Sequence, residues 1–236
     1  EAGVIASVTA GLGVDHRVFT EVTPNPERAV VRQLAGVMGK TDLVIGVGGG
    51  SVLDAAKAAT AIPTVEPADR DPIDGLHDWP IDRPVPSPEA KIPLVLIPTT
   101  AGTGSETGHW AVLSDHDRDE KLSVGHPVML ADLALLDPEL TTSLPQYMTA
   151  VSGFDVIAHA LEALVSTDET PLTSPAARDA YYRAIGTLPT AVHEGGKLAA
   201  RTGMLAASYL AGWAMNNAGL GAVHGISHAI GGRYDT

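Results

Sequence analysis

The clearest architectural signal in this chain is Leu43-Val44-Ile45-Gly46-Val47, followed directly by Gly48-Gly49-Gly50-Ser51. The first five residues form a continuous apolar run as long as a strand, and residues 52–61 carry a helical pattern. A buried strand that turns through glycines into a helix is typical of a parallel sheet with helices on both faces. The sequence therefore predicts an α/β fold with a mostly parallel sheet.

Outward from this stretch, the first half of the chain keeps alternating apolar runs with helical segments. Residues 94–97 form a second strand candidate and residues 133–136 a third, shorter one. Residues 18–19 are a further short candidate near the start. These runs are short and bounded by turn residues, as expected for strands of one sheet.

Two other segments complete the first half. Residues 26–38 predict a helix, with Asn25 before it as the cap and Pro26 at its first position. The segment 63–90 is rich in Pro and Asp, so we expect an excursion over the surface.

The second half has a different texture, because its apolar residues recur at helical spacing. Helices are expected at residues 147–166, 174–192 and 198–218. The last of these is dense in small residues, which would let helices approach closely. We expect two domains: an α/β nucleotide-binding domain over residues 1–146 and an all-helical domain over residues 147–236.

Composition excludes several classes of function. The net charge of −13 repels phosphate backbones, so we expect no nucleic-acid partner; good solubility or adaptation to high salt would each explain the charge. The chain has no cysteine, hence no disulfide framework and no thiolate metal site. No apolar run of membrane-spanning length and no leader pattern is visible, so we expect no membrane association and a cytoplasmic location.

Two loops follow the first two strand candidates, and both could hold phosphate. Gly49, Gly50 and Ser51 lie where the backbone can approach a ligand and where the start of a helix favours an anion. After the next strand, a second loop supplies hydroxyl groups; this threonine loop is Thr99-Thr100-Ala101-Gly102-Thr103-Gly104-Ser105-Glu106. The spacing is not that of the Gly-x-Gly-x-x-Gly fingerprint, but ligands of open α/β sheets bind at this edge. The two loops together predict a nucleotide cleft; Lys121 could add positive charge there, although spacing alone favours a surface lysine.

The second half carries a histidine and aspartate constellation. Asp155 and His159 lie four residues apart in a predicted helix, and His224 and His228 repeat that spacing further on. Such pairs could converge on one divalent cation, or each could be an ordinary core or capping histidine. Glu162 could orient His159 as a hydrogen-bond acceptor, although a solvated position is the simpler interpretation. His109, His116, His126 and His193 lie in polar contexts and are expected at the surface, and His16 and His77 have no such constellation around them.

These blocks, taken in order, resemble the iron-type (group III) alcohol dehydrogenases. Gly48-Gly49-Gly50-Ser51 with Asp54 and Lys57 is similar to the first signature of that family, and the threonine loop is similar to the second. Similar blocks continue through the chain, namely Leu135 to Thr141, Gly153-Phe154-Asp155 with His159-Ala160-Leu161-Glu162-Ala163, and Asn217 to Gly225 with His228.

The resemblance implies an oxidoreductase that moves hydride between an alcohol or aldehyde and NAD or NADP. It implies a cleft between an α/β domain and a helical domain, with a divalent metal, Fe²⁺ or alternatively Zn²⁺, that acts as a Lewis acid. Asp155, His159 and His224 match metal ligands, and His228 matches a histidine of proton transfer. The cofactor positions matched are Gly49, Gly50, Ser51, Asp54, Thr99, Thr100, Thr103 and Lys121.

The resemblance also predicts departures from the family. The fourth metal ligand of the family lies beyond Thr236, so we expect a fragment lacking both ends, with weak metal binding and little activity alone. Gly108 and Trp110 stand where relatives carry small polar residues near the nicotinamide, which predicts a different substrate pocket. The alternatives are a glycerol-dehydrogenase-like enzyme, a non-catalytic nucleotide-binding remnant and a metal-only binding module. A homo-oligomer is expected, because a cut through a helical domain exposes apolar surface.

Overall fold

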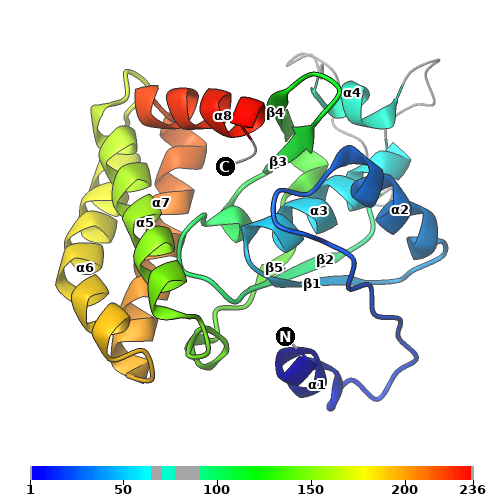
Figure 1. Cartoon of the computed structure of the whole chain (residues 1–236), viewed down its shortest axis with the longest axis horizontal. Coiled ribbons are helices and arrows are strands. Elements are labelled where there is room, and N and C mark those ends of the chain that lie inside the picture. Colours follow the sequence, from blue (N-terminus) through cyan, green and yellow to red (C-terminus); the bar gives the residue numbers. More distant parts are fainter. Residues whose placement is uncertain (1, 65–70, 78–90, 235–236) are drawn as a thin grey trace.

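The structure is a computed structural model that describes residues 2–64, 71–77 and 91–234. A small sheet with its covering helices forms one part, and a bundle of long helices forms the other (Figure 1). The sheet contains β1 (Val44–Gly48), β2 (Leu94–Pro98) and β5 (Leu133–Ala134). All its pairings are parallel and its order is β1-β2-β5, which confirms the predicted parallel sheet.

Helix α3 (Gly50–Ala61) fixes the geometry beside the sheet, because it is buried along most of its length. Leu53 and Ala56 of α3 pack against Leu94 and Leu96 of β2 in one apolar cluster. Helix α2 (Arg28–Met38) packs on α3 from outside. Small residues let α3 lie close to the sheet: a Cβ built on Gly46 of β1 would stand 3.1 Å from Cβ of Ala56 in α3.

Two predictions at the start of the chain are wrong. Residues 18–19 form no strand and pair with no described segment, and Val18 is half exposed. Helix α2 begins at Arg28 with Glu27 as its N-cap, so Asn25 is not the cap and Pro26 is not the first helical position. The reason is that the backbone here joins strand β3 instead: the Ser114 N–H donates to the Pro26 carbonyl at 2.9 Å.

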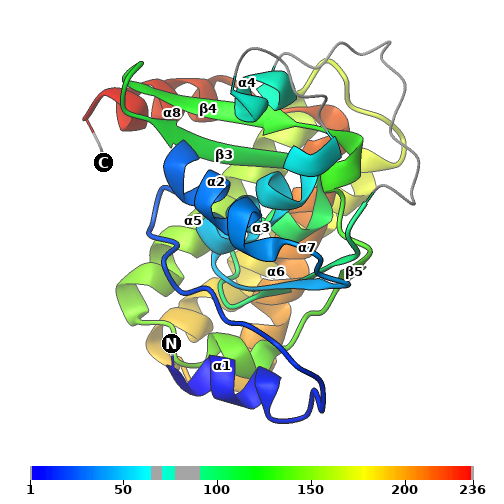
Figure 2. The same ribbon diagram turned by 90° about the vertical axis from the view of Figure 1, so that its right-hand side faces the viewer.

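A hairpin that the sequence analysis missed covers α3 from the far side. Strands β3 (Trp110–Asp115) and β4 (Glu120–Gly125) pair antiparallel, with Leu113 opposite Leu122. Figure 2 shows the hairpin above α2 and α3, with α8 alongside β4. Both leucines join the largest core of the α/β part.

Shorter elements complete the α/β part. Helix α1 (Ala2–Thr9) opens the chain, and α4 (Pro72–His77) lies in the expected surface excursion. Residues 65–70 and 78–90 of that excursion lie outside the described residues. Short 3₁₀ turns occur at Ile62–Thr64, Ser105–Thr107, Pro127–Met129 and Pro138–Thr141.

The second half is helical, as predicted. Helices α5 (Gln146–Val165), α6 (Thr173–His193) and α7 (Leu198–Ala218) pack against one another. Their shared core consists mainly of alanines with a few larger side chains, so the helix axes lie close. Helix α8 (Ala222–Tyr234) then runs from this bundle to the hairpin, where it contacts β4.

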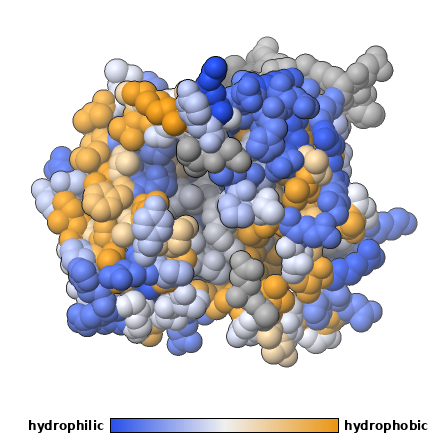
Figure 3. Space-filling view, viewed as in Figure 1, coloured by the Kyte–Doolittle hydropathy of each residue, from blue (hydrophilic) through white to orange (hydrophobic). Residues whose placement is uncertain are grey.

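Among the described residues, α5 alone has the length and composition of a possible membrane span. Its place in the bundle explains that composition otherwise, because it packs against both α6 and α7. It also carries Asp155, His159 and Glu162 on one side, and a hydrocarbon environment would penalise such groups. Apolar surface nevertheless gathers over the helical part of the face shown in Figure 3. Several large apolar side chains of α5 and α8 are exposed, namely Tyr147, Val151, Phe154, Val223 and Ile226.

Candidate active site

The two predicted phosphate loops meet at the carboxyl edge of the sheet. The Thr99 N–H donates to the Gly48 carbonyl at 2.9 Å, which continues the β1–β2 ladder into the turns. A Cβ built on Gly50 would stand 2.6 Å from Cγ2 of Thr103, and one on Gly49 would stand 3.3 Å from Cγ2 of Thr100. Glycine is therefore required for the two loops to approach each other. The contact brings together the glycine and threonine residues that the sequence analysis proposed for the cofactor.

The glycine turn, residues 48–51, has the features of an anion site. Helix α3 begins at Gly50, so the positive end of its dipole faces the turn. Ser51 lies in the first turn, and its Oγ accepts a hydrogen bond from the Asn25 N–H at 3.2 Å. The arrangement can hold a phosphate group through backbone donors and the helix dipole.

Asp54 lies beneath the threonine loop and anchors it. Its carboxylate accepts hydrogen bonds from Ser105 Oγ at 2.6 Å and from the Val112 N–H at 3.0 Å. Lys57 Nζ lies 3.1 Å from the same carboxylate. These three contacts occupy the carboxylate on the inner side, so Asp54 joins α3, the threonine loop and β3.

Lys57 is almost fully buried, with 1% of its side chain exposed. Its ammonium donates to the carbonyl of Ser105 at 2.8 Å and also to the carbonyl of Trp110. Next to it lies Glu106, which is buried and whose Oε1 has no hydrogen-bond partner. Burial raises the pKa of Glu106, and its backbone hydrogen bond and the Lys57 charge only partly offset that effect. A cluster of ionisable side chains, Asp54, Lys57 and Glu106, thus lies directly behind the two loops.

The threonine loop also contacts the helical bundle. A Cβ on Gly102 would lie 2.7 Å from Cβ of Ser152 in α5, and one on Gly104 would lie 2.6 Å from the Gly212 Cα in α7. Gly104 has φ 59°, a left-handed conformation that suits glycine. One loop therefore contacts the glycine turn, helix α7, and helix α5, which carries Asp155 and His159.

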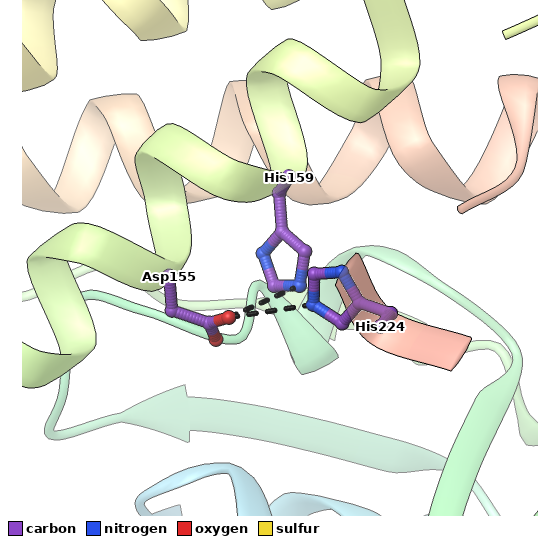
Figure 4. Close-up of side chains that lie close together, drawn as sticks. All are labelled: Asp155, His159 and His224. Carbon is purple, nitrogen blue, oxygen red and sulfur yellow. Dashed lines mark ion pairs between the residues drawn. The ribbon is translucent and has the colours of Figure 1, made fainter. Parts of the chain in front are cut away.

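Asp155, His159 and His224 converge as predicted (Figure 4). Asp155 Oδ1 lies 3.6 Å from His159 Nε2 and 3.4 Å from His224 Nε2. The two imidazoles stack with centroids 4.5 Å apart, and the three candidate ligand atoms all lie within 4.8 Å of one another. Two imidazole nitrogens and one carboxylate oxygen suit a divalent transition metal such as iron or zinc, so this donor set fits the predicted ion.

The expectation that Glu162 is solvated is wrong. Its side chain is 7% exposed and contacts His224, not His159. Glu162 Oε2 meets Nδ1 of His224, while Oε1 accepts from the Val223 N–H at 2.8 Å. A carboxylate on Nδ1 fixes the imidazole so that Nε2 faces the other two ligands. The helical spacing of Glu162 from His159 was the one sign of this role in the sequence.

The electrostatics of the cluster follow from burial and mutual charge. Burial raises the pKa of Asp155, but contact with His224 and the charge of His159 lower it more, so the net shift is downward. Contact with Asp155 raises the pKa of His224; burial opposes this, and the bond to Glu162 adds to it. Burial lowers the pKa of His159 more strongly than Asp155 raises it.

His228 and Lys121 lie on the rim of this cluster. The His228 ring meets the His224 ring edge-on with centroids 5.9 Å apart. Burial lowers the pKa of His228, and the charges of His224 and Lys121 lower it further. Lys121 Nζ donates to Asn25 Oδ1, so it is not the solvated lysine that spacing alone favoured.

Among the other histidines, His126 departs most from the expected surface position, and the side chain of His77 lies outside the described residues. His126 is fully buried, and its Nδ1 accepts the Val128 N–H at 3.1 Å to cap a short 3₁₀ turn. The surface prediction for His126 was therefore wrong, because a capping role buries the ring. His116 and His193 are exposed as expected, and His109 is partly buried against Trp110.

Comparison with known proteins agrees with this geometry. The model of iron-containing alcohol dehydrogenases matches residues 1–138, and the model of the C-terminal part of that family matches residues 149–236. The chain belongs to the iron-containing alcohol dehydrogenase family. The fold of this family, an α/β part followed by a helical part, is the fold predicted from the sequence.

Individual relatives of this iron-containing dehydrogenase chain cover nearly all of it. Long-chain-alcohol dehydrogenase 1 of Geobacillus thermodenitrificans is 37% identical over 240 residues, which span 98% of this chain and 58% of the relative. The structure of an alcohol dehydrogenase from Oenococcus oeni superposes with a TM-score of 0.89 at 35% identity, covering 99% of this chain and 60% of that one. Sulfoacetaldehyde reductase from Bifidobacterium kashiwanohense, solved with NAD+, gives 0.85 at 31% identity, covering 98% and 60%. The chain thus spans slightly more than half the length of the relatives it matches.

Proposed function

We propose that this chain carries the cofactor and metal site of an enzyme that transfers hydride between an alcohol or aldehyde and NAD or NADP. The observation that carries the proposal is one loop with two neighbours. Residues 99–104 face the glycine turn on one side, and on the other they pack against α5, which holds Asp155 and His159. A dinucleotide on the turns would therefore end beside the ligand cluster.

Each part of the site has a task in this reaction. Asp155, His159 and His224 would hold a divalent ion, iron by the family's name, which when bound supplies Lewis-acid polarisation of the alcohol oxygen. Glu162 keeps His224 in the ligand orientation. The glycine and threonine turns bind the pyrophosphate and orient the nicotinamide, which carries the hydride chemistry.

His228 is the proposed proton carrier. It lies next to His224 and its pKa is lowered by burial, which favours the neutral imidazole that can accept a proton. The proposed substrate is a small alcohol or aldehyde, because similar proteins include a 1-propanol dehydrogenase of Citrobacter freundii, a 1,3-propanediol dehydrogenase of Klebsiella pneumoniae and the sulfoacetaldehyde reductase named above. A cytoplasmic location and a homo-oligomer remain part of this proposal.

Binding is the deciding measurement, because it tests the cofactor site and the metal site one at a time. NADH fluorescence and titration with Zn²⁺ or Fe²⁺ should each show saturable binding to the 236-residue chain. Asp155→Asn should weaken metal binding at least tenfold and leave NADH binding within about twofold. Asp179→Asn, at an exposed ion pair of α6, is the matched control and should change neither. Failure of the unmodified chain to bind NADH or NADPH at millimolar concentration would overturn the proposal.

A further inference from the structure

Asn25 has a conformation that its sequence position does not explain. It lies between Pro24 and Pro26 and has φ 56°, one of two positive values among non-glycine residues of the described chain, Asp119 being the other. Asparagine tolerates this left-handed region better than most residues, but it is still an uncommon state for a side chain to hold. Since α2 is capped at Glu27, helix capping does not account for it.

The contacts of Asn25 give the reason for its conformation. Its N–H donates to Ser51 Oγ at 3.2 Å, at the start of α3. Its side-chain oxygen Oδ1 accepts a hydrogen bond from Lys121 Nζ, on β4. The left-handed backbone thus lets one residue join the glycine turn to a lysine 96 positions further along the chain.

Lys121 lies between the two halves of the candidate site. Strand β4 packs against α8: a Cβ built on Gly232 of α8 would stand 2.7 Å from the backbone nitrogen of Lys121. Helix α8 also carries His224 and His228, and the charge of Lys121 lowers the pKa of His228. The ammonium is therefore directed from the α8 side toward the glycine turn.

We infer that Asn25 is a positioning residue that holds the Lys121 ammonium beside Ser51, where it meets a bound dinucleotide. A lysine side chain is long and has many rotamers, so an acceptor that fixes its end reduces what must be ordered on binding. Asn25 suits this role because its amide oxygen accepts the ammonium without adding a negative charge beside a phosphate. The inference rests on the proposed dinucleotide binding and adds a residue to it.

Substituting glycine for Asn25 separates the role of the side chain from the role of the backbone. Asn25→Gly keeps the left-handed conformation and the N–H that bonds Ser51, and it removes the side-chain oxygen that accepts from Lys121. We expect NADH affinity, measured by fluorescence titration, to fall about five- to tenfold while the melting temperature changes little. Asp119→Gly, at the other left-handed residue, is the matched control and should bind NADH normally.

A double-mutant cycle with Lys121→Met distinguishes positioning from a purely structural effect. If Asn25 acts through Lys121, Asn25→Gly should cause no further loss of affinity in the Lys121→Met background. Normal NADH binding by Asn25→Gly, or an equal loss in both backgrounds, would overturn this inference alone. Absence of NADH binding by the unmodified chain would instead overturn the proposed function, and this inference with it.

Discussion

Glu162 and His224, which lie 62 positions apart in sequence, form a carboxylate–imidazole pair that joins two helices. Glu162 on α5 contacts Nδ1 of His224 on α8, and it also accepts the N–H of Val223 in the first turn of α8. Burial raises the pKa of Glu162, but these hydrogen bonds lower it more, so the carboxylate is the favoured form. The pair fixes both the tautomer of His224 and the place where α8 begins.

Glu162→Gln should therefore weaken metal binding without removing a metal ligand. Loss of the carboxylate leaves the His224 imidazole freer to rotate or to take the other tautomer. We expect the affinity for Zn²⁺ or Fe²⁺ to fall about 10- to 100-fold in competition with a chromophoric chelator. Glu194→Gln, in an exposed pair with Lys197, provides the control and should leave the affinity unchanged. An unchanged affinity of Glu162→Gln would mean that packing alone orients His224.

Lys57→Met tests whether the buried cluster behind the loops is structural. The substitution keeps the length of the side chain but leaves Asp54 without its cation and two carbonyls without a donor. Removing one partner of a buried pair typically costs about 3–5 kcal/mol of unfolding free energy. Urea unfolding followed by circular dichroism measures this cost. Lys197→Met at the surface should be nearly neutral, and an equally small effect for Lys57→Met would show that the cluster contributes little.

Local patterns were sufficient for much of the fold. Helix α7 has the predicted bounds of 198–218, and β1 lies within one residue of its prediction. The helical period of the first and the continuous apolar run of the second are local patterns that need no tertiary information. The missed hairpin did leave a signal. Leu122 and Val124 alternate with polar residues, and the acidic turn before them marks a reversal of the chain.

The connections between distant residues could not be predicted in the same way. Spacing placed Glu162 near His159, but its partner is His224 on another helix. Likewise, Asn25 precedes a helix as a cap would, yet its side-chain oxygen accepts a hydrogen bond from Lys121 on β4. In both cases the polar group could have satisfied itself locally, and only packing of the elements decides which partner it meets.

Gly104→Ala should strongly destabilise the junction between the two parts of the chain. The new Cβ would meet the backbone of Gly212 at 2.6 Å, and the left-handed φ of 59° adds strain for alanine. Backbone cannot move aside as a flexible side chain can, so we expect a loss of about 2–4 kcal/mol in urea unfolding. Gly186→Ala in α6 is the matched control, because its Cβ would meet nothing within 4 Å. That control should gain up to about 1 kcal/mol, since alanine favours helix; a loss in both variants would contradict the packing argument.

Arg28 and Asp115 predict a specific dependence of stability on pH. Arg28 lines a surface cavity of about 370 Å³, away from the candidate active site, and donates to Asp115 at 2.6 Å. Burial raises the pKa of Asp115, but the bond to Arg28 and the charges of Arg28 and Arg118 lower it below the ordinary 3.8. A folded-state pKa below the unfolded value means that the ionised carboxylate stabilises the fold above pH 3.8.

Asp115→Asn should consequently reduce the unfolding free energy by about 1–3 kcal/mol near neutral pH. The difference from the unmodified chain should shrink as the pH falls through the lowered pKa of Asp115, because the native carboxylate is then protonated too. Urea unfolding at several values between about pH 7 and pH 3 measures the difference directly. Asp179→Asn, whose exposed pair with Arg183 is solvated, should show a small difference at every pH. If the deficit of Asp115→Asn stayed constant down to the lowest pH, its origin would be lost hydrogen-bond geometry, and the charge of Asp115 would not be what stabilises the Arg28 cluster.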